Sequence, residues 1–355
     1  MTKEKVLVGL SGGVDSSVSA LLLKEQGYEV HGLFMKNWDD DDGSPYCSIK
    51  EDFMDAAFVA DQIDIPLIQI SFSREYKERV FSYFLSELEA GRTPNPDILC
   101  NKEIKFKEFY NYARSNDYHY IATGHYARTD NVSLFKGKDN SKDQSYFLHA
   151  IDKEVLEHTL FPLGELKKDK VRVIARENNL ITSEKKDSTG ICFIGERPFP
   201  EFVGNYLSGE EGEIVDDNDS VIGTHKGLVF YTLGQRQGLG IGGVKNAPDL
   251  PWYVANKDLE SNKLICVQGN ENPLLFSSEL ETKNTFLIEE SLPKSFDGTA
   301  KVRYRQKDQE CHVELSEGSM KLFFREPQRS VTPGQSVVIY EDEKCLGGGE
   351  IKSIN

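Results

Sequence analysis

The stretch VLVGLSGGVDSS, residues 6–17, decides the fold. Its apolar beginning is typical of a buried strand, its paired glycines allow a tight turn, and the residues that follow have helical spacing. The backbone N–H groups of such a turn, together with the positive end of the helix dipole, suit a phosphate group. Because the lysine of the GxxxxGK(S/T) pattern is missing, the loop differs from that of the phosphoryl-transferring NTPases. The stretch therefore predicts a nucleotide-phosphate site after the first strand.

The residues after this stretch continue the alternation of short strands and helices. Strands are expected over residues 30–35 and 67–70, and helices over 16–26, 50–63 and 73–89. The alternation predicts an α/β domain with a doubly wound parallel sheet, whose ligands bind at the carboxyl ends of the strands. Met35 ends the second strand, and in YIATGHYA (120–127) we expect a further strand that leads into Thr-Gly-His, with Gly124 at its carboxyl end. Both residues are therefore expected at the ligand-binding edge.

Beyond residue 195 the helical pattern stops and short strands with many glycines begin. Strands are expected over residues 221–223, 228–232, 252–255 and 264–267, followed from residue 281 by further short strands separated by turns. This pattern predicts a small, mainly β central domain and a C-terminal β-barrel. We divide the chain into a catalytic domain over 1–200, the central domain over 201–275 and the barrel over 276–355.

The charge of the chain argues against a large basic surface. It has 58 acidic and 42 basic residues, a net charge of −16, whereas nucleic-acid-binding domains are usually basic. Residues 164–186, however, hold seven bases and four acids. Their lysines and arginine could form a local basic face or merely a solvated helix face, and charge alone favours neither. The residues concerned are Lys167, Lys168, Lys170 and Arg172.

No apolar run is long enough to span a membrane, and the first strand begins too early for a signal peptide, so a cytoplasmic location is expected. Six cysteines without a CxxC pair argue against a disulfide framework or a zinc site. The consecutive acids of residues 39–42 lack alternating ligand spacing, so we interpret them as a solvated loop and predict no metal site.

The second informative stretch is GRTPNPDILCN, residues 91–101. Its prolines stiffen a loop, and Asp97 and Cys100 would share one face if a helix begins at Asp97. A helix start and nearby lysines would favour a reactive thiolate. The alternative is a buried structural cysteine beneath an acidic N-cap, and the stretch alone leaves both open.

Three other features contain side chains that could take part in catalysis or binding. DSTGICFIG, residues 187–195, is expected to be a loop that presents the thiol of Cys192 between two glycines. VRYR, residues 302–305, alternates as a strand would, so that two arginines would share a face that could contact a phosphate backbone. His125 follows Gly124, but a lone histidine is more often structural.

Seven motifs occur in order along the chain: SGGVDSS, NPDILCN, TGHYA, KDQSYFL, DSTGICFIG, YTLGQRQGLG and VRYR. The first resembles the SGGxDS loop of the ATP pyrophosphatase superfamily, which holds the β,γ-pyrophosphate of ATP while the reaction takes place at the α-phosphate. The ordered set covers essentially the whole chain and resembles the tRNA-specific 2-thiouridylase family. The resemblance implies a tRNA-uridine 2-sulfurtransferase that replaces the C2 oxygen of wobble uridine (U34) by sulfur and releases AMP and pyrophosphate.

The resemblance also implies the substrates and partners. Residues 1–200 would be an N-type ATP pyrophosphatase domain that uses ATP, with Mg²⁺ bound to the nucleotide. The tRNAs would be the lysine, glutamate and glutamine acceptors, and a cysteine desulfurase or sulfur-relay protein would supply sulfur. No membrane partner is implied.

The resemblance assigns roles to individual residues. Cys100 would be the nucleophile, Cys192 the persulfide carrier and Asp97 the acid/base residue, with a transient Cys100–Cys192 disulfide. The residues matched to ATP binding are Gly9, Leu10, Ser11, Gly12, Gly13, Val14, Asp15, Ser16, Met35 and Gly124. The residues matched to the target base are Asn95, Pro96 and Asp97. The residues matched to other tRNA contacts are His125, Lys142, Asp143, Gln144, Tyr304, Arg305 and Gln335.

The implied chemistry fits these residue types. Adenylation of the uracil C2 oxygen makes AMP the leaving group, after which sulfur attacks C2. Either the outer persulfide sulfur attacks directly, or Cys100 releases sulfide by thiol exchange. Two other interpretations are another SGGxDS enzyme, such as a lysidine or amidotransferase-type synthetase, and a non-catalytic ATP-gated tRNA-binding module. The first needs an amine instead of two thiols, and the second needs no thiol at all.

Overall fold

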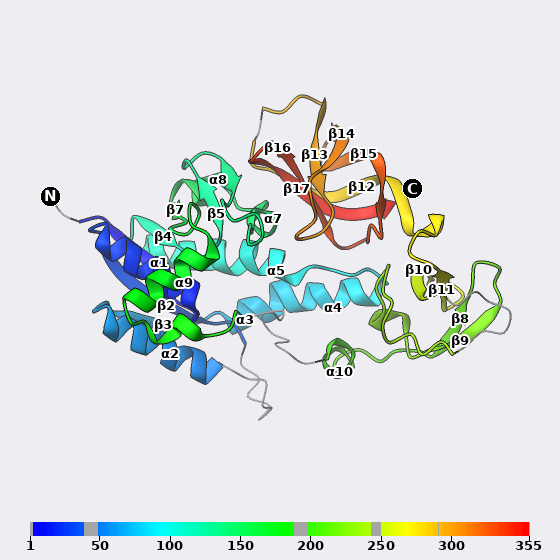
Figure 1. The fold of residues 1–355 in the computed structure, drawn as a ribbon, viewed down its shortest axis with the longest axis horizontal. Coiled ribbons are helices and arrows are strands. Elements are labelled where there is room, and N and C mark those ends of the chain that lie inside the picture. The colour runs from blue at the N-terminus through cyan, green and yellow to red at the C-terminus, as the bar shows by residue number, and fades with distance from the viewer. Residues whose placement is uncertain (1–2, 39–48, 188–197, 243–249, 290, 355) are drawn as a thin grey trace.

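The computed structural model describes residues 3–38, 49–187, 198–242, 250–289 and 291–354. Three sheets, of five, four and eight strands, organise this part of the chain. Figure 1 shows the α/β part at the left, the C-terminal barrel above and to the right, and the central sheet at the lower right. Helices α4 (Ser82–Glu89) and α5 (Pro96–Leu99) lie between them, below the barrel.

The five-stranded sheet is parallel and has the order β3-β2-β1-β4-β7. Its strands are β1 (Lys5–Gly9), β2 (Glu29–Lys36), β3 (Leu67–Ser71), β4 (Tyr120–Ala122) and β7 (Thr159–Leu160). Val6 and Val8 pack into one core cluster, whereas Leu7 between them packs into another. Because neighbouring residues of a strand point to opposite faces, both faces of β1 are covered. The prediction of a doubly wound parallel sheet is confirmed.

Helices cover the two faces of this sheet (Figure 1). One face packs against α1 (Val14–Glu25), α2 (Ile49–Gln62) and α9 (Lys168–Glu177). The other packs against a helical run made of α3 (Ser73–Tyr76), the π-helical η1 (Lys77–Phe81), α4, α5, the π-helical η2 (Cys100–Glu108) and α6 (Phe109–Ser115). The remaining helical segments are α7 (Ser145–Leu148), α8 (Lys153–Glu157), η3 (Ile181–Glu184) and α10 (Phe199–Val203).

The central sheet has the order β10-β11-β8-β9 and its own small core. Its strands are β8 (Gly212–Val215), β9 (Val221–His225), β10 (Trp252–Asp258) and β11 (Lys263–Gln268). The predicted strand over 228–232 is wrong, because Leu228–Phe230 is the 3-10 helix η4. Gly227 before it has φ 130°, a turn conformation that ends the extended backbone.

The C-terminal sheet closes on itself, because β12 (Phe276–Leu287), which follows the short 3-10 helix η5 (Pro273–Leu275), pairs with both β15 (Ser319–Arg329) and β17 (Lys344–Ile354). The other barrel strands are β13 (Ser295–Lys301), β14 (Gln309–Ser316) and β16 (Ser336–Glu341). The predicted β-barrel is confirmed, and its closure leaves these six strands without a free edge between β12 and β17.

The barrel is extended by two strands from the first half of the chain. β5 (Ala127–Thr129) and β6 (Leu134–Lys136) form a hairpin, and β6 pairs with the first two residues of β17. The strand predicted to lead into Thr-Gly-His is β4, which stops at Ala122 in the parallel sheet, and β5 begins in the other sheet. Gly124 and His125 lie in the connection between the two sheets.

Polar contacts hold this junction together. The Lys136 ammonium donates to Asp308 at 2.8 Å, and the Tyr146 hydroxyl donates to the Ser336 carbonyl at 2.7 Å. Partners this far apart in sequence cannot be found from local periodicity.

A buried histidine at the same junction predicts an acid-sensitive stability. Nδ1 of His149 donates to the Tyr146 carbonyl at 2.9 Å, and burial lowers the pKa of His149 to about 4. Since the unfolded value is near 6.5, its contribution to stability is complete above pH 6.5 and is lost as pH falls toward 4, by up to about 3 kcal/mol. We expect the Tm to drop between pH 7.5 and pH 5.

The matched control is the exposed His119. We expect His149→Leu to reduce the drop in Tm between the two pH values and His119→Gln to leave it as in the wild type. An unchanged drop in His149→Leu would contradict this linkage.

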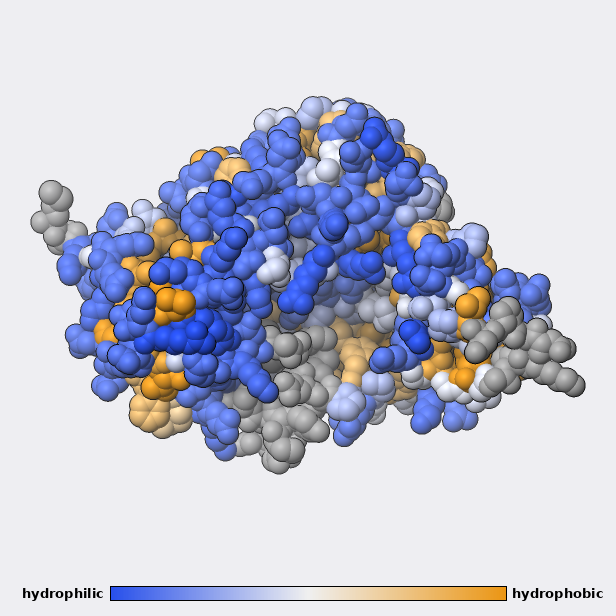
Figure 2. Space-filling model, viewed as in Figure 1, coloured by the Kyte–Doolittle hydropathy of each residue, from blue (hydrophilic) through white to orange (hydrophobic). Residues whose placement is uncertain are grey.

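The described surface is largely polar. Figure 2 shows a face on which hydrophilic residues predominate and apolar residues gather in small groups. Within the described ranges, no helix has both the length and the apolar character needed to cross a membrane.

Candidate functional site

The SGGVDSS loop forms the predicted strand–turn–helix. Gly12 has φ +76°, and a Cβ atom there would lie 2.2 Å from the Asp52 carbonyl oxygen. The N-cap of α1 is Gly13, and no side chain caps this helix end. The Ser16 hydroxyl instead accepts from the Ser11 N–H at 3.2 Å and donates to the Gly13 carbonyl at 3.0 Å. The loop is thus held by its own serines around an uncapped helix N-terminus, which suits an anion.

The other matched ATP residues surround this loop. A Cβ atom on Gly9 would lie 3.3 Å from Met35 Cε, and one on Gly124 would lie 2.8 Å from the Ser16 backbone nitrogen. Leu10 and Val14 are buried, so they offer a nucleotide their backbone only. We call Gly9–Ser16 with Met35 and Gly124 the nucleotide rim; it lies at the carboxyl ends of β1, β2 and β4, the edge that the sequence predicted.

The second predicted site lies on a helix that begins at Pro96. Asn95 is the N-cap and accepts from the Asp97 N–H at 3.2 Å, so the helix begins one residue before Asp97. α5 continues directly into η2, and we call the combined segment, residues 96–108, the thiol helix. Asp97 and Cys100 are three positions apart on it and share a face. Cys100 is fully buried, with 0% exposure.

The thiol helix and α6, which continues it, lie beside the nucleotide rim. The ring of Phe106, in the thiol helix, lies 5.8 Å from that of His125, the residue after Gly124, and a Cβ atom on Gly9 would lie 3.6 Å from the ring of Phe109, the first residue of α6. Burial holds the pKa of His125 well below its usual range, so this imidazole is neutral beside the rim. The fold therefore places the helical run that carries the matched nucleophile beside the matched ATP site, although about 90 residues separate the two motifs in the chain.

Loop 91–95, which leads into the thiol helix, is hydrogen-bonded to both the barrel and the central domain. The Thr93 N–H donates to the Pro333 carbonyl at 2.9 Å, and the Gln335 side chain donates to the Thr93 carbonyl at 2.7 Å. From the central domain, Lys257 donates to the Gly91 carbonyl at 3.0 Å. Gln335, matched to tRNA binding, thus holds the loop that carries the residues matched to the target base.

The three matched residues of KDQSYFL are engaged within the protein. Lys142 donates to Asp187 at 2.8 Å, and the Gln144 side chain accepts from the Tyr126 N–H at 3.0 Å. Asp143 is buried, accepts from two backbone N–H groups and forms an ion pair with Lys301 at 3.3 Å. These contacts join the connection after β6 to the barrel and to Asp187.

The matched pair Tyr304 and Arg305 lies in a turn. The predicted strand over 302–305 is wrong, because β13 ends at Lys301 and the Gln306 side chain accepts from the Val302 N–H at 2.8 Å. Arg305 has φ 63° and its guanidinium lies 5.2 Å from the Tyr304 ring centroid. The two arginines therefore do not share a strand face.

Tyr304 is nevertheless linked to the thiol helix through Phe147. Its ring lies 4.4 Å from that of Phe147, whose carbonyl accepts from the Asn101 side chain at 3.4 Å. Phe147 therefore links Tyr304, in a turn of the barrel, to Asn101, the residue next to Cys100.

Cys192 lies outside the described residues, as does the whole of 188–197, so the predicted thiol loop and the Cys100–Cys192 pair are not located. Residues 39–42 also lie outside them. Of the other described cysteines, Cys266, Cys311 and Cys345 are buried, and burial raises the pKa of each to about 12. Such thiols are poor nucleophiles at neutral pH.

The structure adds one residue that the sequence analysis did not single out, Lys168. Its ammonium contacts both Asp15 oxygens, at 2.8 and 2.7 Å, and Asp187 at 2.8 Å. Asp15 also accepts from the Tyr126 hydroxyl at 2.7 Å. Although burial of Asp187 opposes ionisation, hydrogen bonds from Lys142 and Lys168 lower the pKa of Asp187 to about 2.

Helical spacing could have distinguished Lys168 from its neighbours. Lys168, Val171 and Ala175 are the buried residues of α9, at positions i, i+3 and i+7, while Lys167 and Lys170 are exposed. The basic segment is therefore neither wholly a basic face nor wholly a solvated one. Arg172 also points inward, to Asp187 at 2.8 Å.

In the described part of the chain, no group of three or more His, Cys, Asp or Glu side chains is arranged to hold a metal ion. The carboxylate nearest the phosphate loop, Asp15, is occupied by Lys168.

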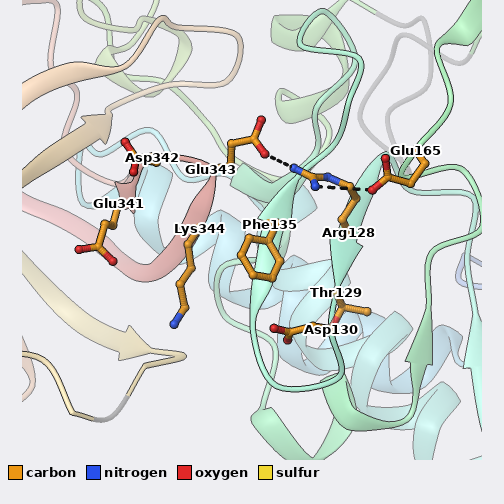
Figure 3. A pocket seen from close by; sticks show the side chains of 9 residues that line it. All are labelled: Arg128, Thr129, Asp130, Phe135, Glu165, Glu341, Asp342, Glu343 and Lys344. Atoms are coloured by element: carbon orange, nitrogen blue, oxygen red, sulfur yellow. Dashed lines mark hydrogen bonds and ion pairs between the residues drawn. The ribbon is translucent and has the colours of Figure 1, made fainter.

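A pocket of about 590 Å³ lies elsewhere, at the junction of β5–β6 with the β16–β17 turn (Figure 3). In Figure 3, Arg128 reaches between Glu343 and Glu165, and Phe135 lies beside it. The pocket is open and acidic, and it shares no residue with the nucleotide rim or the thiol helix. We assign it no role in the reaction.

Comparisons with known proteins agree with this arrangement. Residues 4–196 match the family described as tRNA methyl transferase HUP domain, residues 200–268 its PRC-barrel domain, and residues 277–351 an aminomethyltransferase beta-barrel domain. The chain is 57% identical over 358 aligned residues to a protein of Francisella philomiragia named tRNA-specific 2-thiouridylase MnmA; the alignment covers 99% of this chain and 100% of that one. Its namesake in Francisella tularensis subsp. novicida matches with the same identity and coverage.

Among solved structures, NMN synthetase from Francisella tularensis matches with a TM-score of 0.35 and 17% identity, over 57% of this chain and 73% of that one. A likeness this distant supports no statement about this chain.

Proposed function

The chain belongs to the tRNA-specific 2-thiouridylase family, and from this premise we propose how its residues carry out the reaction. It is a tRNA 2-thiouridylase, a sulfurtransferase that uses ATP and acts on tRNA. The two other interpretations of the SGGxDS loop, a different adenylating synthetase and a non-catalytic module, find no support in these relatives. The observation that carries our proposal is the position of the thiol helix and α6 beside the nucleotide rim.

The nucleotide rim binds ATP with its triphosphate over Gly12–Ser16, and Mg²⁺ enters with the nucleotide. The uncapped N-terminus of α1 supplies N–H groups and the positive end of the helix dipole. The C2 oxygen of U34 attacks the α-phosphorus, the bond to the β-phosphate breaks, and pyrophosphate leaves with the electron pair. Asp97 accepts the proton that the uracil loses from N3, and Asn95 and Pro96 cradle the base, which must leave its stack to reach them.

Sulfur then replaces the activated oxygen. In one route the outer sulfur of a Cys192 persulfide attacks C2 and expels AMP, and Cys100 then attacks the Cys192 sulfur to free the product. In the other, Cys100 attacks the persulfide first and releases sulfide, which attacks C2. Both routes end with a Cys100–Cys192 disulfide, which a reductant reopens, so both balance in atoms and electrons.

The remaining assignments complete the proposal. His125, Lys142, Asp143, Gln144, Tyr304, Arg305 and Gln335 form or support the tRNA-binding surface. The acceptors are the lysine, glutamate and glutamine tRNAs, and a cysteine desulfurase or sulfur-relay protein loads Cys192. The domains are 1–200, 201–275 and 276–355, and the enzyme works in the cytoplasm, where it meets its tRNA.

The test is thiolation of a wobble-uridine tRNA with ATP, Mg²⁺ and a protein sulfur donor. We expect Cys192→Ser to abolish thiolation, because serine carries no persulfide, and to retain tRNA-dependent pyrophosphate release. Mercury-gel retardation of the tRNA measures the first quantity and a pyrophosphate assay the second.

The control is Cys266→Ala, which removes a buried thiol of the central core and should thiolate like the wild type. Intact thiolation by Cys192→Ser would refute the persulfide assignment, and pyrophosphate release that does not depend on tRNA would refute uridine adenylation.

A further inference from the structure

Lys168 is the cation that contacts the SGGVDSS loop within the described residues. It is the first residue of α9, which lies beside α1 in Figure 1. Its side chain is 10% exposed, against 31% for Asp15 and 30% for Asp187. Three carboxylate oxygens within 2.8 Å satisfy all three hydrogens of its ammonium.

Burying the Lys168 ammonium at the start of α9 costs free energy, which suggests that its charge serves a function. A buried ammonium loses hydration, and a cation at a helix N-terminus opposes the helix dipole. Two carboxylates offset these costs, yet a pair of packed apolar residues would usually stabilise a fold as well as a buried ion pair does. Both carboxylates are more exposed than the lysine between them, so the ion pairs are partly accessible from outside the core.

A bound triphosphate creates a need for this charge. Phosphates over Gly12–Ser16 would lie next to the Asp15 carboxylate, because Asp15 is part of the same turn. Like charges at that separation repel strongly in a partly buried site. The loop has no lysine of its own, unlike the GxxxxGK(S/T) loop, whose lysine contacts the β- and γ-phosphates.

We propose that Lys168 is a phosphate-binding residue of the ATP site, which rests on the proposed binding of ATP to the nucleotide rim. Without nucleotide the ammonium lies between Asp15 and Asp187. With ATP bound it donates to non-bridging oxygens of the terminal phosphates while keeping a contact with Asp15. It thereby supplies from α9 the charge that the loop lacks, and it stabilises pyrophosphate as the bond to the α-phosphorus breaks and the electron pair moves onto the leaving group.

A merely structural role for Lys168 makes a different prediction. If the lysine only held Asp15 and Asp187 together, its loss would disturb the loop for every adenine nucleotide. If it binds the terminal phosphates, its loss weakens ATP but leaves AMP unaffected, because AMP has no β- or γ-phosphate.

The experiment is titration of the full-length protein with ATP and with AMP by calorimetry. We expect Lys168→Met to raise the Kd for ATP at least about tenfold and to leave the Kd for AMP within about twofold, while Lys168→Arg keeps part of the ATP affinity. The matched control is Lys170→Met, an exposed lysine of the same helix, which should bind both nucleotides like the wild type.

Should Lys168→Met fail to fold, the double variant Lys168→Met with Asp187→Asn removes the partner charge too and gives the same comparison. Unchanged ATP binding, or an equal loss of ATP and AMP, overturns the phosphate-binding role. A wild-type protein that binds no ATP would overturn the proposed function and this inference with it, whereas a wild type that binds ATP beside an unaffected Lys168→Met overturns the inference alone.

Discussion

Replacing Cys100 by alanine is expected to reduce tRNA thiolation by at least about a thousandfold. In the proposed reaction the Cys100 thiol is the nucleophile that completes sulfur transfer, and neither ATP nor the rest of the site supplies another. Pyrophosphate release in the presence of tRNA should continue, since the nucleotide rim remains intact. The measurement is thiolation of a wobble-uridine tRNA with a protein sulfur donor, followed beside pyrophosphate release.

The control for this variant is Cys345→Ala. Both thiols are 0% exposed, so both substitutions remove a fully buried sulfur. Cys345 lies in the strand that receives the β5–β6 hairpin, where it pairs with Leu134, and burial raises its pKa to about 12. We expect near-wild-type thiolation from it; thiolation by Cys100→Ala at the same level would exclude Cys100 as the nucleophile.

The burial of Cys100 has a mechanistic consequence. A thiol with no exposed surface can reach a bound base only after groups that cover it move. Hydrogen bonds hold this region: Gln335 and Pro333 bond to Thr93, and Phe147 bonds to Asn101. Gln335 belongs to the barrel, and Phe147 contacts its turn at Tyr304. These contacts therefore connect the barrel, which carries part of the proposed tRNA-binding surface, to loop 91–95 and the thiol helix.

The second large effect is expected from Gly12→Ala, which should raise the Kd for ATP about a hundredfold. An alanine at φ +76° is strained, and its Cβ would lie 2.2 Å from the Asp52 carbonyl oxygen, so the loop or α2 must shift. Strain of about 3 kcal/mol corresponds to roughly a hundredfold in binding. Titration with ATP, together with the Tm of the nucleotide-free protein, separates a loss of binding from a loss of fold.

The neighbouring glycine provides the comparison. Gly13 has φ −96°, and the nearest atom to its built Cβ is Ser11 Oγ at 3.6 Å, an ordinary contact. Gly13→Ala should therefore weaken ATP binding far less than Gly12→Ala. Equal effects of the two substitutions would show that the steric conflict with Asp52 is not what constrains the loop.

Much of the fold could be predicted because its signals are local. Val6–Val8 are apolar and the glycines follow them directly, so strand, turn and helix are fixed within twelve residues. The same holds for the thiol helix, where Asn95 and Pro96 supply the cap and the first turn. The strand predicted over 302–305 was wrong because the Gln306 side chain accepts from the Val302 N–H in place of a backbone partner. Alternation of residue types alone cannot report such a bond.

The sequence by itself determined the chemistry: a phosphate loop without a lysine, two thiols in separate motifs, and an ordered set of motifs that identified the family. Only the tertiary structure decided which of several similar residues are used. It buried Lys168 against Asp15 and left Lys170 exposed, joined the β5–β6 hairpin to the barrel, and clamped Thr93 with Gln335. The physical reason is that these choices depend on contacts between residues up to 242 positions apart, whereas periodicity and turn chemistry extend over only a few.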